Sequence, residues 1–157
     1  MGLSGLFGFM TVPVTYPVRT HSKWVDHLKV TNDYRLIHFP QHINYDDPDI
    51  LDKLIDDHDV VVNLIGAGSW LKNYDFIYDS NVTMAKRIAE ASAKSPYVKR
   101  FIHVSAVGVD PHSNSTRLST KWLGEQEVKN AYPDATIIRP TTIFGEYDNF
   151  ITRWAKL

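Results

Sequence analysis

Three glycines near the start of the sequence have the spacing of a phosphate-binding turn. Gly2, Gly5 and Gly8 have two residues between each pair. In a dinucleotide-binding fold, such a turn follows a strand and opens a helix whose N-terminal amides receive a pyrophosphate. Here no strand precedes the glycines, and residues 10–18 already form an extended pattern that contains two prolines. The triplet therefore indicates either a nucleotide site without its first strand and helix, or a flexible tail.

An arginine follows the extended segment, at the position whose side chain contacts the adenosine ribose in dinucleotide-binding folds. An acidic residue at this point binds the 2′-hydroxyl of NAD, whereas an arginine accommodates the 2′-phosphate of NADP. Arg19 occupies the position, with His21 and Lys23 close by, and a guanidinium matches phosphate in bidentate geometry. Arg19 predicts NADPH in preference to NADH, with a solvated loop arginine as the alternative.

A serine and a lysine form a second candidate site. Ser105 ends a predicted strand, and Lys121 lies on a predicted helix. In short-chain dehydrogenases, a serine at this place orients a substrate carbonyl, and a tyrosine four residues before the lysine transfers a proton. Here that position holds Arg117, which cannot donate a proton at neutral pH. The sequence therefore predicts no catalytic residue.

Strand and helix patterns alternate along the rest of the chain. Predicted strands cover 35–39, 59–65, 99–105 and 135–139, and predicted helices cover 48–57, 74–93 and 116–132. Asp47 is a plausible N-cap ahead of Pro48. The unbroken apolar run in 59–65 predicts a strand covered on both faces. The alternation predicts an α/β fold, a doubly wound, Rossmann-like parallel sheet with helices on both faces that is incomplete at its first strand and helix.

Length and composition narrow the function classes. A chain of 157 residues predicts one domain, 1–157. The net charge of −1 gives no sign of a nucleic-acid partner, and no apolar run reaches the roughly 18 residues of a membrane span. There is no cysteine, and the seven histidines lack metal-site spacing. We therefore expect no metal site, and histidines that lie in solvent or at strand edges.

The carboxyl ends of the predicted strands are where ligands bind in such sheets. The strand at 59–65 runs into Gly66 and Gly68, and glycine there lets the backbone approach a ligand closely. An ordinary strand-to-loop turn explains the same residues equally well.

Several stretches together resemble one family, the atypical short-chain dehydrogenases of the extended kind. Among these the chain is most similar to the NADPH-binding accessory subunits of mitochondrial respiratory complex I. The stretches that carry the resemblance are the glycine triplet, 16–19, 61–66, 100–105, 121–128, 132–140 and 143–148.

The resemblance implies a structural NADPH in a non-catalytic accessory subunit. Such a subunit docks onto other subunits of a large membrane-bound complex, on the matrix side of the inner mitochondrial membrane. The resemblance also places Ile43 and Asn44 facing the adenine, and the loop from Pro140 along the nicotinamide. The cofactor-binding residues that it implies are Gly2, Gly5, Gly8, Arg19, Ile43, Asn44, Leu64, Ile65, Gly66, Ser105, Lys121 and Pro140.

Two other functions remain open on the sequence. One is a working NAD(P)-dependent oxidoreductase or epimerase on the same scaffold, and the other is a truncated product without a function of its own. The family continues into a smaller C-terminal region that is largely absent from these 157 residues. A sheet without its first strand exposes two inner edges, so we expect the isolated chain to be marginally stable or prone to aggregate. Four tryptophans are candidates for either core or docking positions: Trp24, Trp70, Trp122 and Trp154.

Overall fold

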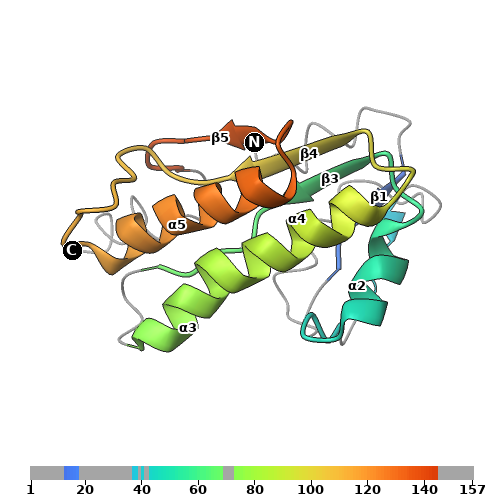
Figure 1. Ribbon diagram of the computed structural model, residues 1–157, viewed down its shortest axis with the longest axis horizontal. Helices are drawn as coiled ribbons and strands as arrows, with labels where there is room; N and C mark the ends of the chain where they lie inside the picture. Colours follow the sequence, from blue (N-terminus) through green and yellow to red (C-terminus); the bar gives the residue numbers. More distant parts are fainter. Residues whose placement is uncertain (1–12, 18–36, 39, 41–42, 69–72, 145–157) are drawn as a thin grey trace. The chain divides into compact units, whose positions relative to one another are not determined.

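The computed structural model describes residues 13–17, 37–38, 40, 43–68 and 73–144 (Figure 1). The chain divides into two compact units, one of Met1–Tyr45 with Ile143–Leu157 and the other of Asp46–Thr142. The glycine triplet and Arg19 lie outside the described residues, and their roles stay predictions.

The first unit contains a short parallel pair of strands. Strands β1 (Val14–Thr15) and β2 (Ile37–His38) pair in parallel. The ladder continues where the Tyr16 amide donates to the His38 carbonyl at 2.8 Å. Both strands fall within the segments predicted to be extended, but they are shorter than the patterns suggested.

The second unit contains a three-stranded parallel sheet. Its strands are β3 (Val60–Asn63), β4 (Arg100–Val104) and β5 (Thr136–Ile138), in that spatial order. All neighbours run in parallel, and Asn63 lies opposite His103. The prediction that the strands at 59–65 and 99–105 are parallel neighbours is confirmed.

Helix α2 (Pro48–Ile55) begins as its sequence predicts. The Asp47 carboxylate accepts a hydrogen bond from the Asp49 amide at 3.0 Å. Pro48 occupies the first helical turn, where the missing amide hydrogen costs nothing. The helix buries Leu51 and Ile55, and so covers part of the core with one apolar face.

The helix predicted over 74–93 is present, but it is not regular. It consists of α3 (Tyr74–Tyr78), a π-helical turn η2 (Asp79–Thr83) and α4 (Met84–Lys94). The Asn73 side chain caps its start. Single π-helical turns inside α-helices are rare and often occur at functional sites.

The core lies between the sheet of the second unit and two helices. Figure 1 shows α4 and α5 (Thr116–Ala131) side by side along one side of the strands, below β4 and β5 in the view. Phe101 of β4 and Val128 of α5 are completely buried there, and the Phe101 ring contacts Tyr132 with centroids 5.7 Å apart. Because alternate strand residues face opposite sides, Phe101 and His103 both point toward this helical layer.

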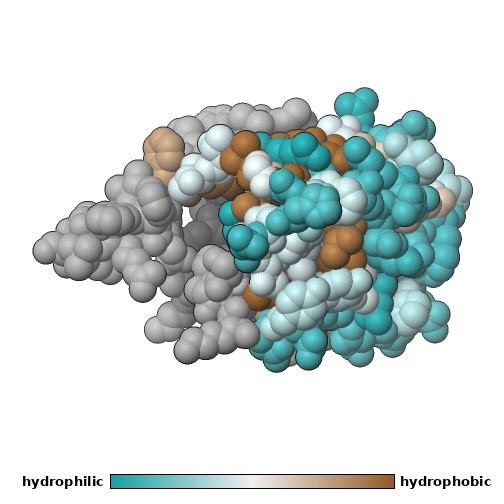
Figure 2. Space-filling model, turned by 60° about the vertical axis from the view of Figure 1, so that its left-hand side comes forward, coloured by the Kyte–Doolittle hydropathy of each residue, from teal (hydrophilic) through white to brown (hydrophobic). Residues whose placement is uncertain are grey.

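The opposite face of this sheet is open among the described residues. Val60 and Leu64 are 48% and 55% exposed, and Val62 and Ile138 are exposed as well. Within the second unit the helices cover one face of the sheet, and coverage of the strand at 59–65 on its other face stays a prediction. Figure 2 shows one side of the molecule, on which brown hydrophobic residues interrupt a mostly teal surface.

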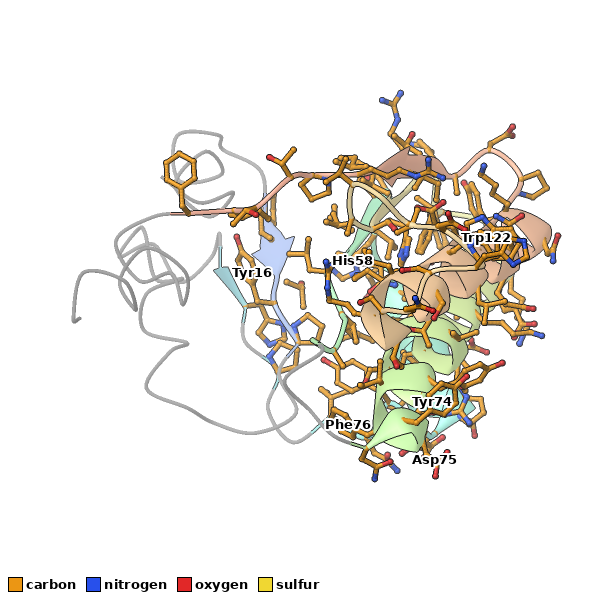
Figure 3. All side chains as sticks on the ribbon, turned by 90° about the vertical axis from the view of Figure 1, so that its left-hand side faces the viewer. Tyr16, His58, Tyr74, Asp75, Phe76 and Trp122 are labelled. Atoms are coloured by element: carbon orange, nitrogen blue, oxygen red, sulfur yellow. The ribbon has the colours of Figure 1, made fainter. Side chains whose placement is uncertain are left out.

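The described aromatic residues are divided between core and surface. Trp122 of α5 is half-buried, so it belongs fully to neither group, and the other three tryptophans lie outside the described residues. Tyr74 and Phe76 of α3 are exposed, and Figure 3 shows both at one end of the helical layer.

A glycine allows α5 to approach η2 closely. A Cβ atom on Gly124 would lie 2.1 Å from the carbonyl oxygen of Asn81, so backbone packs against backbone. We expect Gly124→Ala to lower the free energy of unfolding by about 2 kcal/mol or more, although alanine favours a helix by about 1 kcal/mol. Urea denaturation measures the change.

The matched control is Asn130→Ala, at an exposed position on the same helix. It should change the free energy of unfolding by less than about 0.5 kcal/mol. An unchanged urea midpoint for the Gly124 variant would show that the two helices do not pack in this way.

Candidate functional site

The carboxyl ends of β3, β4 and β5 bring together part of the predicted site. The Ser105 amide donates to the Ile138 carbonyl at 2.8 Å, and the Val107 amide donates to the Pro140 carbonyl at 2.9 Å. These bonds extend the ladder between β4 and β5 past the ends of both strands. Ser105 and Pro140 therefore lie on adjacent segments of the second unit.

Lys121 reaches from α5 to the same edge. Its Nζ donates to the Val104 carbonyl at 3.3 Å, and a Cβ atom on Gly66 would lie only 2.9 Å from it. Burial lowers the pKa of Lys121, the nearby Arg117 lowers it further, and Glu125 partly offsets both effects. The structure thus places a partly buried ammonium group beside the glycine that ends β3.

A buried amide holds the loop after β3 in place. The Asn81 Oδ1 atom accepts from the Ala67 amide at 2.8 Å, and Asn81 Nδ2 donates to the Ala67 carbonyl at 3.4 Å. The same Nδ2 donates to Thr120 Oγ1 at 2.9 Å. The loop, η2 and α5 are therefore joined through one side chain. Asn81 is not among the residues that the sequence predicts for the site, although an amide inside the apolar pattern of the predicted helix is a signal for such a role.

A second buried pair joins β3 to β4. Asn63 Oδ1 accepts from the Ile65 amide at 3.0 Å, so its Nδ2 is the group that donates to His103 Nδ1 at 3.1 Å. This assigns the His103 proton to Nε2, which is buried and has no hydrogen-bond partner in the described part of the chain.

His103 corrects an expectation from the sequence. It lies in the middle strand and is 1% exposed, so the prediction of a histidine in solvent or at a strand edge is wrong here. Burial lowers the pKa of His103 to about 4, the Lys121 charge acts in the same direction, and Glu125 opposes them. His103 is therefore neutral at neutral pH.

An ion pair joins Arg139, directly after β5, to Glu125 of α5. Arg139 Nε and Nη2 donate to the two Glu125 carboxylate oxygens at 2.9 and 2.6 Å. Burial raises the pKa of Glu125, but Arg139 outweighs that effect and the net pKa lies below its ordinary value. The buried Ser105 hydroxyl also lowers this pKa, although it completes no hydrogen bond of good geometry.

The remaining predicted site residues are divided between the two units. Ile43 and Asn44 belong to the first unit, and Leu64 and Ile65 follow β3 in the second unit, with Leu64 exposed. No group of three histidine, cysteine or acidic residues among the described positions could hold a metal ion. Within the described ranges, no helix is long and apolar enough to cross a membrane.

The parallel sheet, the glycine at its edge and the lysine of the following helix are features of a dinucleotide-binding class. The family model of the NAD dependent epimerase/dehydratase family matches residues 14–156, and the chain belongs to this family. Its doubly wound, Rossmann-like fold is therefore established, and membership indicates a nicotinamide dinucleotide as the class of cofactor.

Curated relatives of the chain are subunits of respiratory complex I. It is 37% identical over 151 residues to mouse NADH dehydrogenase (ubiquinone) 1 alpha subcomplex subunit 9, mitochondrial, which covers 95% of this chain and 39% of the relative. It is 39% identical over 133 residues to the mitochondrial 40 kDa subunit of NADH-ubiquinone oxidoreductase from Neurospora crassa. This match covers 83% of this chain and 34% of the relative. The chain thus spans about two fifths of these relatives or less, and the resemblance found in the sequence is confirmed.

Solved structures with the same fold include a dehydratase and a reductase. The dTDP-glucose 4,6-dehydratase DesIV from Streptomyces venezuelae, with NAD and TYD bound, has a TM-score of 0.76 at 17% identity. This match covers 98% of this chain and 56% of the DesIV chain. The dTDP-4-dehydrorhamnose reductase from Bacillus anthracis, in complex with NADP, has a TM-score of 0.67 at 15% identity. This match covers 94% of this chain and 60% of the reductase chain. At these identities the likeness concerns the fold alone.

The buried ion pair should matter more for stability than an exposed one on the same helix. The Glu125 side chain is 0% exposed, while Arg139 is 49% exposed. Removing one partner of a buried pair costs roughly 3–5 kcal/mol, and water around Arg139 keeps the cost at the lower end. We expect Glu125→Gln to lower the free energy of unfolding by about 3 kcal/mol, measured by urea denaturation.

Glu127→Gln is the matched control, because Glu127 pairs with Lys86 at the surface at 3.0 Å. Exposed pairs contribute about 0–1 kcal/mol. Equal losses in the two variants would mean that the Glu125–Arg139 pair is not buried as described.

His103 should make stability depend on pH. The unfolded chain binds a proton at His103 near pH 6.5, but the folded chain does so only near pH 4. Stability from this group is therefore complete above pH 6.5 and falls as the pH is lowered toward 4, by about 3 kcal/mol in total. Urea denaturation of wild type and His103→Gln between pH 4 and 7 measures this contribution.

The exposed His112 supplies the control variant His112→Gln, which should keep the wild-type pH profile. If His103→Gln kept the wild-type profile too, the buried position of His103 would be refuted.

Proposed function

We propose that the chain serves as a non-catalytic accessory subunit of mitochondrial respiratory complex I, on the matrix side of the inner membrane, and holds NADPH as a structural cofactor. The observation that carries the proposal is the similarity to complex I subunits over nearly the whole chain. The exposed aromatic residues of α3, Tyr74 and Phe76, are of the kind that subunit interfaces use.

The arrangement at the carboxyl ends of the strands supports a nucleotide site. Because Gly66 has no side chain, Lys121 Nζ can lie close to the carboxyl end of β3, where it presents a cation. In this proposal the nicotinamide half of NADPH lies along Ser105, Lys121 and Pro140. The glycine triplet, Arg19 and the segment Ile43–Asn44 stay the predicted contacts of the pyrophosphate, the 2′-phosphate and the adenine.

Arg117 supports a site without turnover. Hydride chemistry of the short-chain dehydrogenase type needs a proton donor four residues before the lysine, and a general acid or base contributes about 10²–10⁴-fold in rate. Arg117 cannot supply the proton. Steady-state oxidation of NADPH that depends on this chain and is lost on Lys121→Ala would instead favour the oxidoreductase or epimerase alternative.

Association with complex I is the direct test of the proposed function. Mitochondria that express the tagged chain are solubilised in mild detergent, and native complexes are separated by size. We expect the chain to migrate with complex I and to carry NADPH. Recovery of the chain only as a small, free species would contradict the accessory role, and would favour a product without a function of its own.

Arg19 should set the choice between the two cofactors. We expect the chain to bind NADPH more tightly than NADH, and Arg19→Ala to reduce the ratio of affinities by roughly ten- to a hundredfold, because each charge-assisted hydrogen bond is worth about 1.5–3 kcal/mol. Titration calorimetry with each cofactor measures the ratio. Arg100→Ala, at an exposed arginine of β4, is the control, and equal affinities of the wild-type chain for both cofactors would refute the assignment.

A further inference from the structure

Two cations stand one turn apart on α5. Arg117 and Lys121 are four residues apart within the helix, so their side chains share one face. The charge of Arg117 is strong enough at Lys121 to lower the pKa of that lysine. Like charges at this spacing destabilise a helix unless something stabilises them.

No acidic side chain of the described residues neutralises this pair. Glu125 is the nearby carboxylate, but Arg139 engages both of its oxygens. Lys121 has only the neutral Val104 carbonyl as hydrogen-bond partner, and Arg117 forms no ion pair in the described part of the chain. His103, whose pKa is lowered by the Lys121 charge as well as by burial, is neutral at neutral pH. Neither cation therefore has an ion-pair partner in the described part of the chain, and Glu125 offsets the positive charge at Lys121 only in part.

Their position distinguishes them from ordinary surface cations. Both side chains are half-buried, whereas Lys86 and Lys99 each form an ion pair at the surface. Lys121 Nζ lies against Gly66 at the carboxyl end of β3, where sheets of this class bind ligands. A partly buried pair of like charges at a ligand edge is the arrangement expected of an anion site.

We propose that Arg117 and Lys121 together bind an oxyanion, a carboxylate or phosphate group. The guanidinium offers two parallel donors to such a group, and the ammonium adds a compact point charge. The arginine that removes proton-transfer chemistry from the site thus supplies anion recognition in its place. The inference goes beyond the proposed function, and it holds whether or not the chain binds NADPH.

Inorganic phosphate is the probe for this site. The full chain is titrated with phosphate at constant ionic strength, with binding followed by calorimetry and by the NMR signals of the side-chain nitrogens. We expect saturable binding, and a loss of roughly ten- to a hundredfold in affinity for Arg117→Gln, from the removal of one charge-assisted contact. Arg117→Lys, which keeps the charge, should retain part of the affinity.

Lys129→Gln is the matched control, because Lys129 is an exposed cation on the same helix. It should leave phosphate binding unchanged. An absence of saturable binding, or equal losses in the Arg117 and Lys129 variants, would overturn the proposal. Circular dichroism establishes that each variant is folded.

A second titration identifies the source of the oxyanion. If saturating NADPH displaces phosphate, the dinucleotide and the oxyanion share the site. If phosphate binding is unchanged in the presence of bound NADPH, the site takes the anion of a separate small molecule. Failure of NADPH to bind while phosphate still binds would contradict the proposed cofactor and leave the oxyanion site standing.

Discussion

The contact on which the rest of the second unit depends is the buried Asn81 side chain. One amide satisfies both backbone groups of Ala67 and also donates to Thr120. Because a buried polar group without a partner costs roughly 1–3 kcal/mol, these three bonds fix the loop after β3 against α5. The π-helical turn presents Asn81 to both partners, and Gly124 allows the helix to come close enough. Gly66 and Lys121 meet because this bridge aligns the segments that carry them.

The electrostatics of the site follow from the same packing. Glu125 is buried and forms an ion pair with Arg139. Because Arg139 neutralises the Glu125 carboxylate, Glu125 offsets the charge of Lys121 only in part. His103 is a neutral ring because its burial disfavours the charged form, and the nearby Lys121 charge disfavours that form further. The sheet edge is therefore positive through Arg117 and Lys121. A site of this charge suits an anionic cofactor or ligand.

Helix caps and apolar patterns predicted most of the helices and strands. They could not predict contacts between residues that are far apart in the sequence. The Asp47 cap and Pro48 mark the start of α2 correctly, and apolar runs locate β3, β4 and β5. Coverage of the other face of β3 stays a prediction, because an apolar run does not say what covers it. The partners of Asn81 and His103 lie 14 to 40 residues away in the chain, beyond any periodic pattern. In the candidate site, Ser105, Lys121 and Pro140 are brought to one edge, but the glycine triplet and Arg19 remain predictions.

The central claim is that Asn81 holds the loop after β3, and amide hydrogen exchange at Ala67 tests it most directly. The Ala67 amide donates to Asn81 alone, so its protection reports this bond. The account predicts slow exchange in the wild-type chain, and exchange at least about tenfold faster in Asn81→Ala, from the loss of a bond worth about 1.4 kcal/mol or more, while the amides of β4 keep their protection. Equal protection of Ala67 in both proteins would contradict the account.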